Sequence, residues 1–227
     1  MTKIPQMDSS LDRQTRRQLR AQKTRKRLLA AARQVFAQRG MDMTRIDEIT
    51  EAADVGKGTF YNYFHSKEDL INELIRQVLD ELSAVIDRRC RGISDLKGLL
   101  DALIGAHIEF FCSRWEDFVL YFQCRTDLIL SAGYAGIDMP FLKYLARIQD
   151  LLRPVLSYSL PDTTVRRAAC ALAGFVSGYY SFAVLASEGE DVDAVFGSLR
   201  GAFVASFARF VQETAPGPEQ GAKPATA

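Results

Sequence analysis

Apolar side chains recur every three or four residues along almost the whole chain, and no stretch alternates convincingly as a β-strand does. The first apolar stripe follows Leu28, Ala32, Val35 and Phe36 and stops at Gly40. Glycine at this place is typical of a left-handed helix C-cap. The spacing therefore predicts an all-α fold whose first helix ends near residue 39.

Two short helices are predicted next. Thr44 is the expected N-cap of the first, and Asp47 three residues later completes a capping box. A turn at residues 54–56 separates it from a helix running from about Lys57 to Phe64. Two short helices joined by a turn that contains glycine are typical of a helix-turn-helix.

Longer helices are predicted for the rest of the chain, at about 67–90, 94–113, 116–131, 139–157, 162–187 and 192–212. Polar residues without helical spacing occupy residues 1–17, and three prolines fall within residues 214–227. The expected organisation is a flexible basic arm (1–17), a helix-turn-helix domain (18–66), a carboxy-terminal helical domain (67–213) and a disordered tail (214–227).

Composition narrows the class of protein. The 227 residues are 48% hydrophobic and 25% charged, which excludes a collagen, a disulfide scaffold and a wholly disordered chain. The net charge is only +1, but residues 1–67 hold 14 basic and 7 acidic side chains, whereas residues 68–227 hold 15 and 21. This asymmetry favours a nucleic-acid contact confined to the amino-terminal end.

Cysteine spacing and hydropathy indicate in which cellular compartment the protein is expected, and whether it is expected to cross a membrane. The four cysteines show no C-x-x-C spacing, and the first residues are basic rather than apolar, so we expect reduced thiols in a cytoplasmic protein. Residues 168–186 form a charge-free run long enough to cross a bilayer. Serine, glycine and tyrosine dilute this run, which favours a buried core helix over a membrane contact.

The third predicted helix has the surface of a recognition helix. At 100° per residue Phe60 and Phe64 lie about 40° apart and face inward, whereas Asn62 points away. Asn62 suits an adenine edge, Thr59 a thymine methyl or a phosphate, and Gly58 permits close approach of the backbone. Phosphate contacts are suited to Lys57, Tyr61, Tyr63, His65 and Lys67. Both tyrosines are equally suited to packing within the small domain.

These motifs resemble a known family. The residues Lys57-Gly-Thr-Phe-Tyr61, then Tyr63-Phe64, then Ser66-Lys-Glu-Asp-Leu70, within residues 25–75, look like the DNA-binding domain of TetR-type transcriptional regulators. The resemblance implies a homodimer that binds a palindromic double-stranded DNA operator, most often as a repressor released by a small effector. It adds Thr44 and Arg45 to the DNA-facing residues. Gly56 departs from the family, which usually has a capping side chain there.

The basic arm is a separate hypothesis. Arg13, Arg16, Arg17 and Arg20 precede the helix-turn-helix and could enter an adjacent minor groove, although a solvated charge run would look the same.

The effector site is expected in the carboxy-terminal domain, and the resemblance rather than the spacing places it there. A small hydrophobic or aromatic effector is expected in an aromatic-lined pocket. His107 could orient this ligand or be a satisfied core histidine. The candidate effector residues are His107, Phe110, Phe111, Trp115, Phe118, Tyr121, Phe122, Arg125, Phe141, Tyr144 and Tyr179.

Small residues at positions 173, 174, 177, 178 and 181 permit close helix contact and, with the phenylalanine-rich last helix, predict a four-helix dimer seam.

Other functional classes are less well supported. The sequence contains no metal-ligand cluster, phosphate-binding loop or nucleophile motif and only two histidines, so we expect neither an enzyme nor a metal or cofactor. The alternative is a redox-sensing regulator in which Cys112 and Cys124 are exposed thiols.

Overall fold

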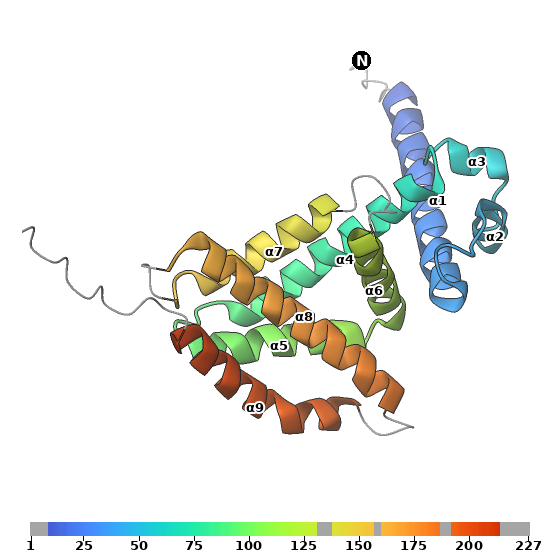
Figure 1. Ribbon diagram of the computed structural model, residues 1–227. Coiled ribbons are helices and arrows are strands. Elements are labelled where there is room, and N and C mark those ends of the chain that lie inside the picture. The colour runs from blue at the N-terminus through green and yellow to red at the C-terminus, as the bar shows by residue number, and fades with distance from the viewer. Residues whose placement is uncertain (1–8, 131–137, 157–159, 187–191, 214–227) are drawn as a thin grey trace, which may run out of the picture. The chain divides into compact units, whose positions relative to one another are not determined.

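The computed structural model describes residues 9–130, 138–156, 160–186 and 192–213. All regular elements within these ranges are α-helices, as expected, and Figure 1 shows their order. They are α1 (Ser9–Arg39), α2 (Ile46–Ala52), α3 (Lys57–Tyr61), α4 (Lys67–Cys90), α5 (Leu96–Cys112), α6 (Trp115–Leu130), α7 (Asp138–Leu152), α8 (Asp162–Ala186) and α9 (Val192–Glu213).

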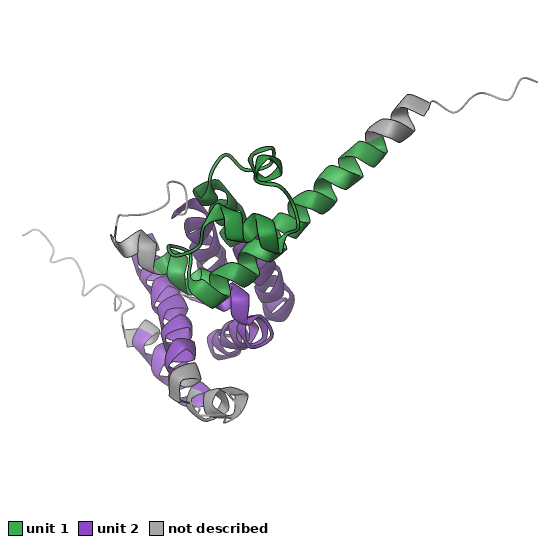
Figure 2. Ribbon diagram, turned by 90° about the vertical axis from the view of Figure 1, so that its right-hand side faces the viewer, with its two compact units in different colours: residues 1–75, 119–134 green, residues 76–118, 135–227 purple. Residues whose placement is uncertain are grey.

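The chain forms two compact units (Figure 2). Unit 1 comprises residues 1–75 and 119–134, and unit 2 comprises residues 76–118 and 135–227. The division falls inside α4 and inside α6, so it differs from the boundary expected after residue 66. Most of α6, from Val119 onward, therefore belongs to the same unit as the helix-turn-helix.

Unit 1 is built around the apolar stripe of α1. Leu28, Phe36, Ile49 and Phe60 are completely buried, and Phe64 is 1% exposed. The rings of Phe60 and Phe64 lie 5.7 Å apart, so α3 and the turn that follows it share one aromatic contact. Burial of an aromatic side chain of this size is among the largest contributions to a small core.

Two left-handed residues delimit the helices of unit 1. Gly40 has a φ of +82° and its N–H donates to the carbonyl of Phe36, so α1 ends at the expected residue. Asp54, with a φ of +50°, ends α2 in a Schellman motif. Its N–H donates to Glu51 and the next N–H donates to Thr50. The Arg27 guanidinium holds this turn through the carbonyls of residues 53 and 54.

Unit 1 also contains a long-range contact between the α1–α2 turn and α6. The backbone N–H of Met41 donates to Oε1 of Gln123, 3.2 Å away, and the Cys124 and Met41 sulfur atoms lie 3.8 Å apart. Met41 and Cys124 are buried. The helix-turn-helix thus depends on residues about eighty positions further along the chain.

Unit 2 packs α5 against α9 and α7 against α8. The Asp95 side chain caps α5 by accepting the N–H of Gly98 at 2.7 Å. Ion pairs join the second half of α4 to later segments: Asp87 pairs with Arg147 of α7 at 2.6 Å, and Glu81 pairs with Arg114 in the α5–α6 turn. Such exposed pairs contribute little stability individually, so the apolar interfaces carry most of it.

One face of α8 is buried. Ala169, Leu172, Val176 and Tyr180 recur at helical spacing and are at most 4% exposed. No described helix combines the length and hydropathy that crossing a bilayer requires. The buried face of α8 agrees with the core helix expected for the charge-free run.

Two local expectations need correction. Helix α1 begins at Ser9, so residues 9–17, expected in a flexible arm, are helical, whereas residues 1–8 and the tail at 214–227 lie outside the described ranges. The α2 N-cap is Arg45 rather than Thr44. The backbone N–H of Arg45 donates to the Glu48 carboxylate, so Glu48 rather than Asp47 completes the capping box. The backbone hydrogen bond from Arg45 lowers the pKa of the Glu48 carboxyl.

Candidate functional site

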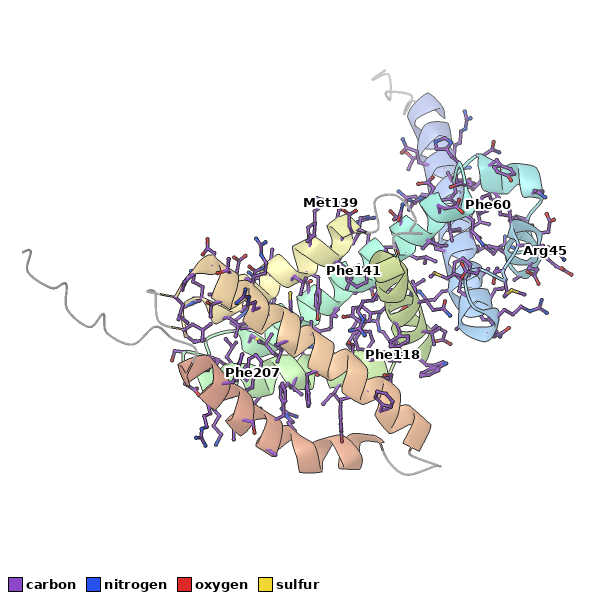
Figure 3. The ribbon with its side chains drawn as sticks, in the orientation of Figure 1. Arg45, Phe60, Phe118, Met139, Phe141 and Phe207 are labelled. Carbon is purple, nitrogen blue, oxygen red and sulfur yellow. The ribbon has the colours of Figure 1, made fainter. Side chains whose placement is uncertain are left out.

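Helix α3 presents a small polar surface on an aromatic base. Phe60 and Phe64 face the core, and Lys57, Gly58, Tyr61, Asn62 and His65 are exposed. Thr59 and Tyr63 are half-buried. Figure 3 shows Phe60 between α3 and α1, with Arg45 on the outer side of α2. The structure therefore brings eight of the ten candidate DNA-facing residues to the surface of one unit.

The backbone of α3 agrees with a recognition role. Gly56 is the N-cap, as expected, and the helix ends three residues earlier than predicted, although the N–H of Phe64 still donates to the carbonyl of Phe60 at 3.0 Å. A Cβ at Gly58 would meet no atom within 4 Å. The missing side chain therefore leaves open surface through which another backbone can approach.

An ion pair links α2 and α3 across this surface. Lys57 Nζ lies 2.8 Å from Asp47 Oδ1, and both side chains are more than half exposed. The hydrogen bond from Lys57 to the Asp47 carboxylate raises the pKa of Lys57, so this lysine is charged at neutral pH. A phosphate can compete with Asp47 for an exposed ammonium because the exposed pair is weak in water.

Thr44 does not belong to the exposed surface. Its side chain is 2% exposed, and its hydroxyl donates to the carbonyl of Gly40 at 2.7 Å. This hydrogen bond closes the α1–α2 turn, which explains why Thr44 is not the α2 N-cap. The expectation that the Thr44 side chain faces DNA is wrong.

Lys67 is likewise turned into unit 1. Its Nζ donates to the carbonyls of Met41 at 2.8 Å, Thr44 at 3.1 Å and Asp42 at 3.5 Å. The ammonium therefore satisfies carbonyl groups of the α1–α2 turn that no helix uses. Lys67 therefore positions the α1–α2 turn. The expectation that its ammonium contacts a DNA phosphate is corrected, because the ammonium is bound to these carbonyls.

Replacing Lys67 by methionine is expected to lower the free energy of unfolding by about 2 kcal/mol, because hydrogen bonds to charged groups contribute about 1.5–3 kcal/mol. Methionine keeps the apolar stem, so the change isolates the ammonium. Urea unfolding measures the effect, with Lys26→Met, at an exposed position of α1, as the control. Equal stabilities of the two variants would contradict the role of Lys67.

The candidate effector residues fall in both units. Tyr121, Phe122 and Arg125 belong to unit 1, where the Arg125 guanidinium lies 5.7 Å from the Phe122 ring centroid. Phe122 is 36% exposed and Tyr121 is buried. The remaining eight candidates belong to unit 2.

Four aromatic rings form a cluster in unit 2. Phe118 lies 5.4 Å from Phe111 and 4.4 Å from Tyr180, between ring centroids, and Phe110 lies 5.3 Å from Phe111. All four are buried, whereas Trp115 at the edge is 47% exposed and lies 5.8 Å from Phe118. Spacing alone missed Tyr180, whose hydroxyl donates to the carbonyl of Phe111.

The neighbouring tyrosine takes a different place. Tyr179 is half-buried and stacks on Phe175 at 5.7 Å, so the structure places Tyr180 and not Tyr179 in the aromatic cluster.

His107 is a satisfied core histidine. Its Nδ1 donates to the carbonyl of Leu103 at 2.6 Å, which leaves Nε2 to accept the hydroxyl proton of Tyr144, also at 2.6 Å. Burial lowers the pKa of His107 to about 4 and outweighs the opposing effect of the Leu103 carbonyl. His107 is therefore neutral at pH 7. Of the two roles considered for His107, ligand contact and core packing, the structure fits core packing. Phe141, which is 6% exposed, is likewise part of the core.

A cavity of about 470 Å³ lies elsewhere in unit 2, between the α4–α5 turn and the end of α7. Its lining includes Asp87, Arg91, Arg147 and Asp150. None of the candidate effector residues lines it. Sequence spacing could not identify this cavity because its walls come from two helix ends about sixty residues apart.

The cysteine pair of the redox alternative does not have the expected exposure. Cys112 and Cys170 are exposed, but Cys90 and Cys124 are buried, and none of the four forms a disulfide. Burial raises the pKa of Cys90 to about 11. Cys124 is not an accessible thiol, so the expectation of an exposed pair is wrong.

Known proteins match both the amino-terminal sequence and the fold. Residues 28–74 match the family model of the tetR family of bacterial regulatory proteins. The transcriptional repressor KstR2 of Rhodococcus jostii is 33% identical over 85 residues, which cover 37% of this chain and 42% of that protein. The chain thus spans about two fifths of the length of the KstR2 proteins it matches.

Two further matches extend beyond the helix-turn-helix. The regulator AcrR of Shigella flexneri is 26% identical over 165 residues, covering 70% of this chain and 77% of that protein. The solved structure of FadR from Bacillus subtilis has a TM-score of 0.65 and 19% identity, covering 80% of this chain and 96% of that one. That likeness concerns the fold. The amino-terminal part of the chain, residues 28–74, is therefore similar to the tetR family of bacterial regulatory proteins.

Proposed function

We propose that this protein is a transcriptional repressor that binds a palindromic operator as a homodimer and is released by a small hydrophobic or aromatic effector. The observation that carries the proposal is the exposed surface of α3, with Lys57, Gly58 and Asn62 outward and Phe60 buried behind them. A polar helix face on a rigid apolar base is what recognition in the major groove requires.

Selection from randomised duplex DNA, at stated salt, tests this function. Enrichment of a palindrome is expected, with half-sites spaced to match two α3 helices of a dimer. If the folded dimer enriches no sequence before or after extraction of bound ligands, the proposal fails.

The dimer is proposed to form through α8 and α9. Phe182 on α8 is 71% exposed and Phe210 on α9 is 51% exposed, so both helices present a large apolar side chain that a partner subunit could cover. A Cβ at Gly174, Gly178 or Gly201 would meet no atom within 4 Å, so a partner helix could approach these surfaces closely.

Sedimentation equilibrium at micromolar concentration is expected to give twice the chain mass of 25.4 kDa. A monomer under these conditions would contradict the dimer and, with it, the palindromic operator.

The effector is proposed to contact the aromatic residues of unit 2. FadR from Bacillus subtilis was solved in complex with stearoyl-CoA, which supports a ligand with an apolar portion. The single tryptophan, Trp115, is half exposed beside the aromatic cluster, so its fluorescence is a natural reporter. Titration with acyl thioesters, aromatic compounds and cationic drugs would identify the class of effector.

Helix α4 is the proposed link between effector and DNA, because it begins in unit 1 and continues into unit 2. The effector must bind one state better than the other to release the operator, and couplings of this kind amount to about 1–3 kcal/mol. The coupling is measured as the ratio of operator affinities with and without saturating effector.

A further inference from the structure

The first half of α1 carries a continuous stripe of basic side chains. At 100° per residue, the stripe falls within an arc of about 120° of the helix circumference. Its members are Arg16, Arg17, Arg20, Lys23 and Arg27. Residues 13–39 contain ten basic residues and no acidic one. Residues 15–20 are all exposed, and α1 extends well beyond the other helices of unit 1 (Figure 2).

The stripe faces the same side of α1 as the helix-turn-helix. Arg27, its last member, donates to the carbonyls of Ala53 at 2.6 Å and Asp54 at 3.1 Å, in the turn that leads into α3. The carboxy-terminal end of the stripe therefore lies beside the turn that leads into α3. A duplex that meets α3 is approached by the basic stripe from the same side.

The composition of this segment favours an anionic partner. Arg13 and Arg17, and likewise Arg16 and Arg20, are four residues apart, where like charges destabilise a helix. Arginine, glutamine, alanine and lysine nevertheless favour the helix, and neutralisation by phosphate relieves the repulsion. A helix that lies in a bilayer surface requires an apolar stripe on the face opposite its basic residues. This face of α1 carries Gln14, Gln18 and Gln22 instead, so the segment does not fit a membrane surface.

We propose that the basic stripe of α1 binds the phosphate backbone of the duplex beside the half-site as a preformed helix. This inference rests on the proposed DNA-binding function. A helix about 10–12 Å wide cannot enter a minor groove about 6 Å wide, so the contact differs from the flexible minor-groove arm expected from the sequence. Residues 9–20 add about 18 Å of helix, which reaches along about five base pairs.

The test uses the full chain and the palindrome that selection enriches. In the stripe variant, Arg16, Arg17, Arg20 and Lys23 are each replaced by Gln, a residue that preserves the helix. The control variant replaces Lys97, Lys143, Arg166 and Arg167, four exposed cations of unit 2, by Gln. Fluorescence anisotropy measures the slope of log K against log salt on a duplex with ten extra base pairs on each side.

The stripe variant is expected to reduce the magnitude of this slope by about 0.9 for each phosphate contact removed, and therefore by about 3.6 for two contacts in each of two subunits. Its preferred operator sequence stays unchanged because phosphate contacts carry no sequence information. Trimming the duplex to the palindrome is expected to remove the difference between wild type and stripe variant. The control variant keeps the wild-type slope.

Equal slopes for the wild type and the stripe variant on the long duplex would overturn the proposal while leaving specific binding intact. Cosedimentation of the wild type, but not of the stripe variant, with phosphatidylserine vesicles, together with unchanged slopes, would make the stripe a membrane contact and also overturn it. Failure of every form to enrich a sequence would instead refute the proposed function itself. The outcomes therefore separate the two proposals.

Discussion

Replacing Lys57 and Asn62 together by alanine is expected to weaken operator binding by at least about thirtyfold. A bidentate contact to a base edge contributes about 1–3 kcal/mol of discrimination, and a dimer makes it twice. Both side chains are exposed and lie outside the core of unit 1, so the free energy of unfolding should change by less than about 1 kcal/mol. Anisotropy titrations and urea unfolding measure the two quantities on the same preparations.

The single variants should fail in different ways. Asn62→Ala is expected to relax sequence preference at one position of each half-site. Lys57→Ala should instead weaken binding to all sequences and reduce the magnitude of the salt slope by about 1 for each phosphate that Lys57 neutralises. Met139→Ala with Lys143→Ala, at exposed positions of α7, is the matched control. Operator affinity of the Lys57/Asn62 variant equal to that of this control would refute the assignment of α3 as the recognition helix.

Acidification from pH 7.5 to 5.5 is expected to destabilise unit 2 by about 1 kcal/mol through His107 alone. Burial holds the pKa of His107 at about 4 in the folded state, against 6.5 for the unconstrained residue. The unfolded chain therefore binds a proton between these values and the folded chain does not, so stability falls as the pH falls. The loss approaches about 3 kcal/mol near pH 4.

His107→Gln should flatten this dependence, because glutamine keeps an acceptor for the Tyr144 hydroxyl but does not titrate. His65→Gln is the control, since His65 is the other histidine of the chain and is exposed. Urea unfolding at both pH values gives the comparison. A wild-type pH dependence in the His107→Gln variant would show that other groups cause the acid sensitivity.

Local patterns were sufficient to predict the helix-turn-helix. The angular positions of Phe60, Phe64 and Asn62 follow from a period of 3.6 residues, and Gly40 ends α1 because its backbone is left-handed. These properties depend on neighbouring residues. The all-helical fold was predictable for the same reason, since each helix has its own apolar stripe.

The roles of Thr44 and Lys67 depend on tertiary contacts instead. Thr44 lies four residues after the glycine that ends α1, where a threonine can either cap the next helix or close the turn. The position of the Gly40 carbonyl, which accepts the Thr44 hydroxyl, decides between these two roles. The lysine ammonium meets three carbonyls of a turn more than twenty residues away. Neither contact leaves a periodic signal in the sequence.

The first turns of α1, residues 9–17, are helical although the sequence predicted a flexible arm, because this segment lacks an apolar stripe. The usable signal was intrinsic propensity: residues 9–39 contain neither glycine nor proline and are rich in arginine, glutamine and alanine. Hydrophobic periodicity detects helices that pack against a core, and it therefore misses the part of a helix that extends beyond one.

The hydrogen bond between Met41 and Gln123 also constrains how the protein is made. The amino-terminal unit is complete only when α6 is present, so a ribosome must synthesise more than half of the chain before the recognition helix obtains all of its support. Closure of so long a loop is slow compared with local helix formation. A nascent chain interrupted before residue 119 would carry a basic, incompletely packed helix-turn-helix. A graft of this domain onto another protein must therefore include α6 from Val119 onward.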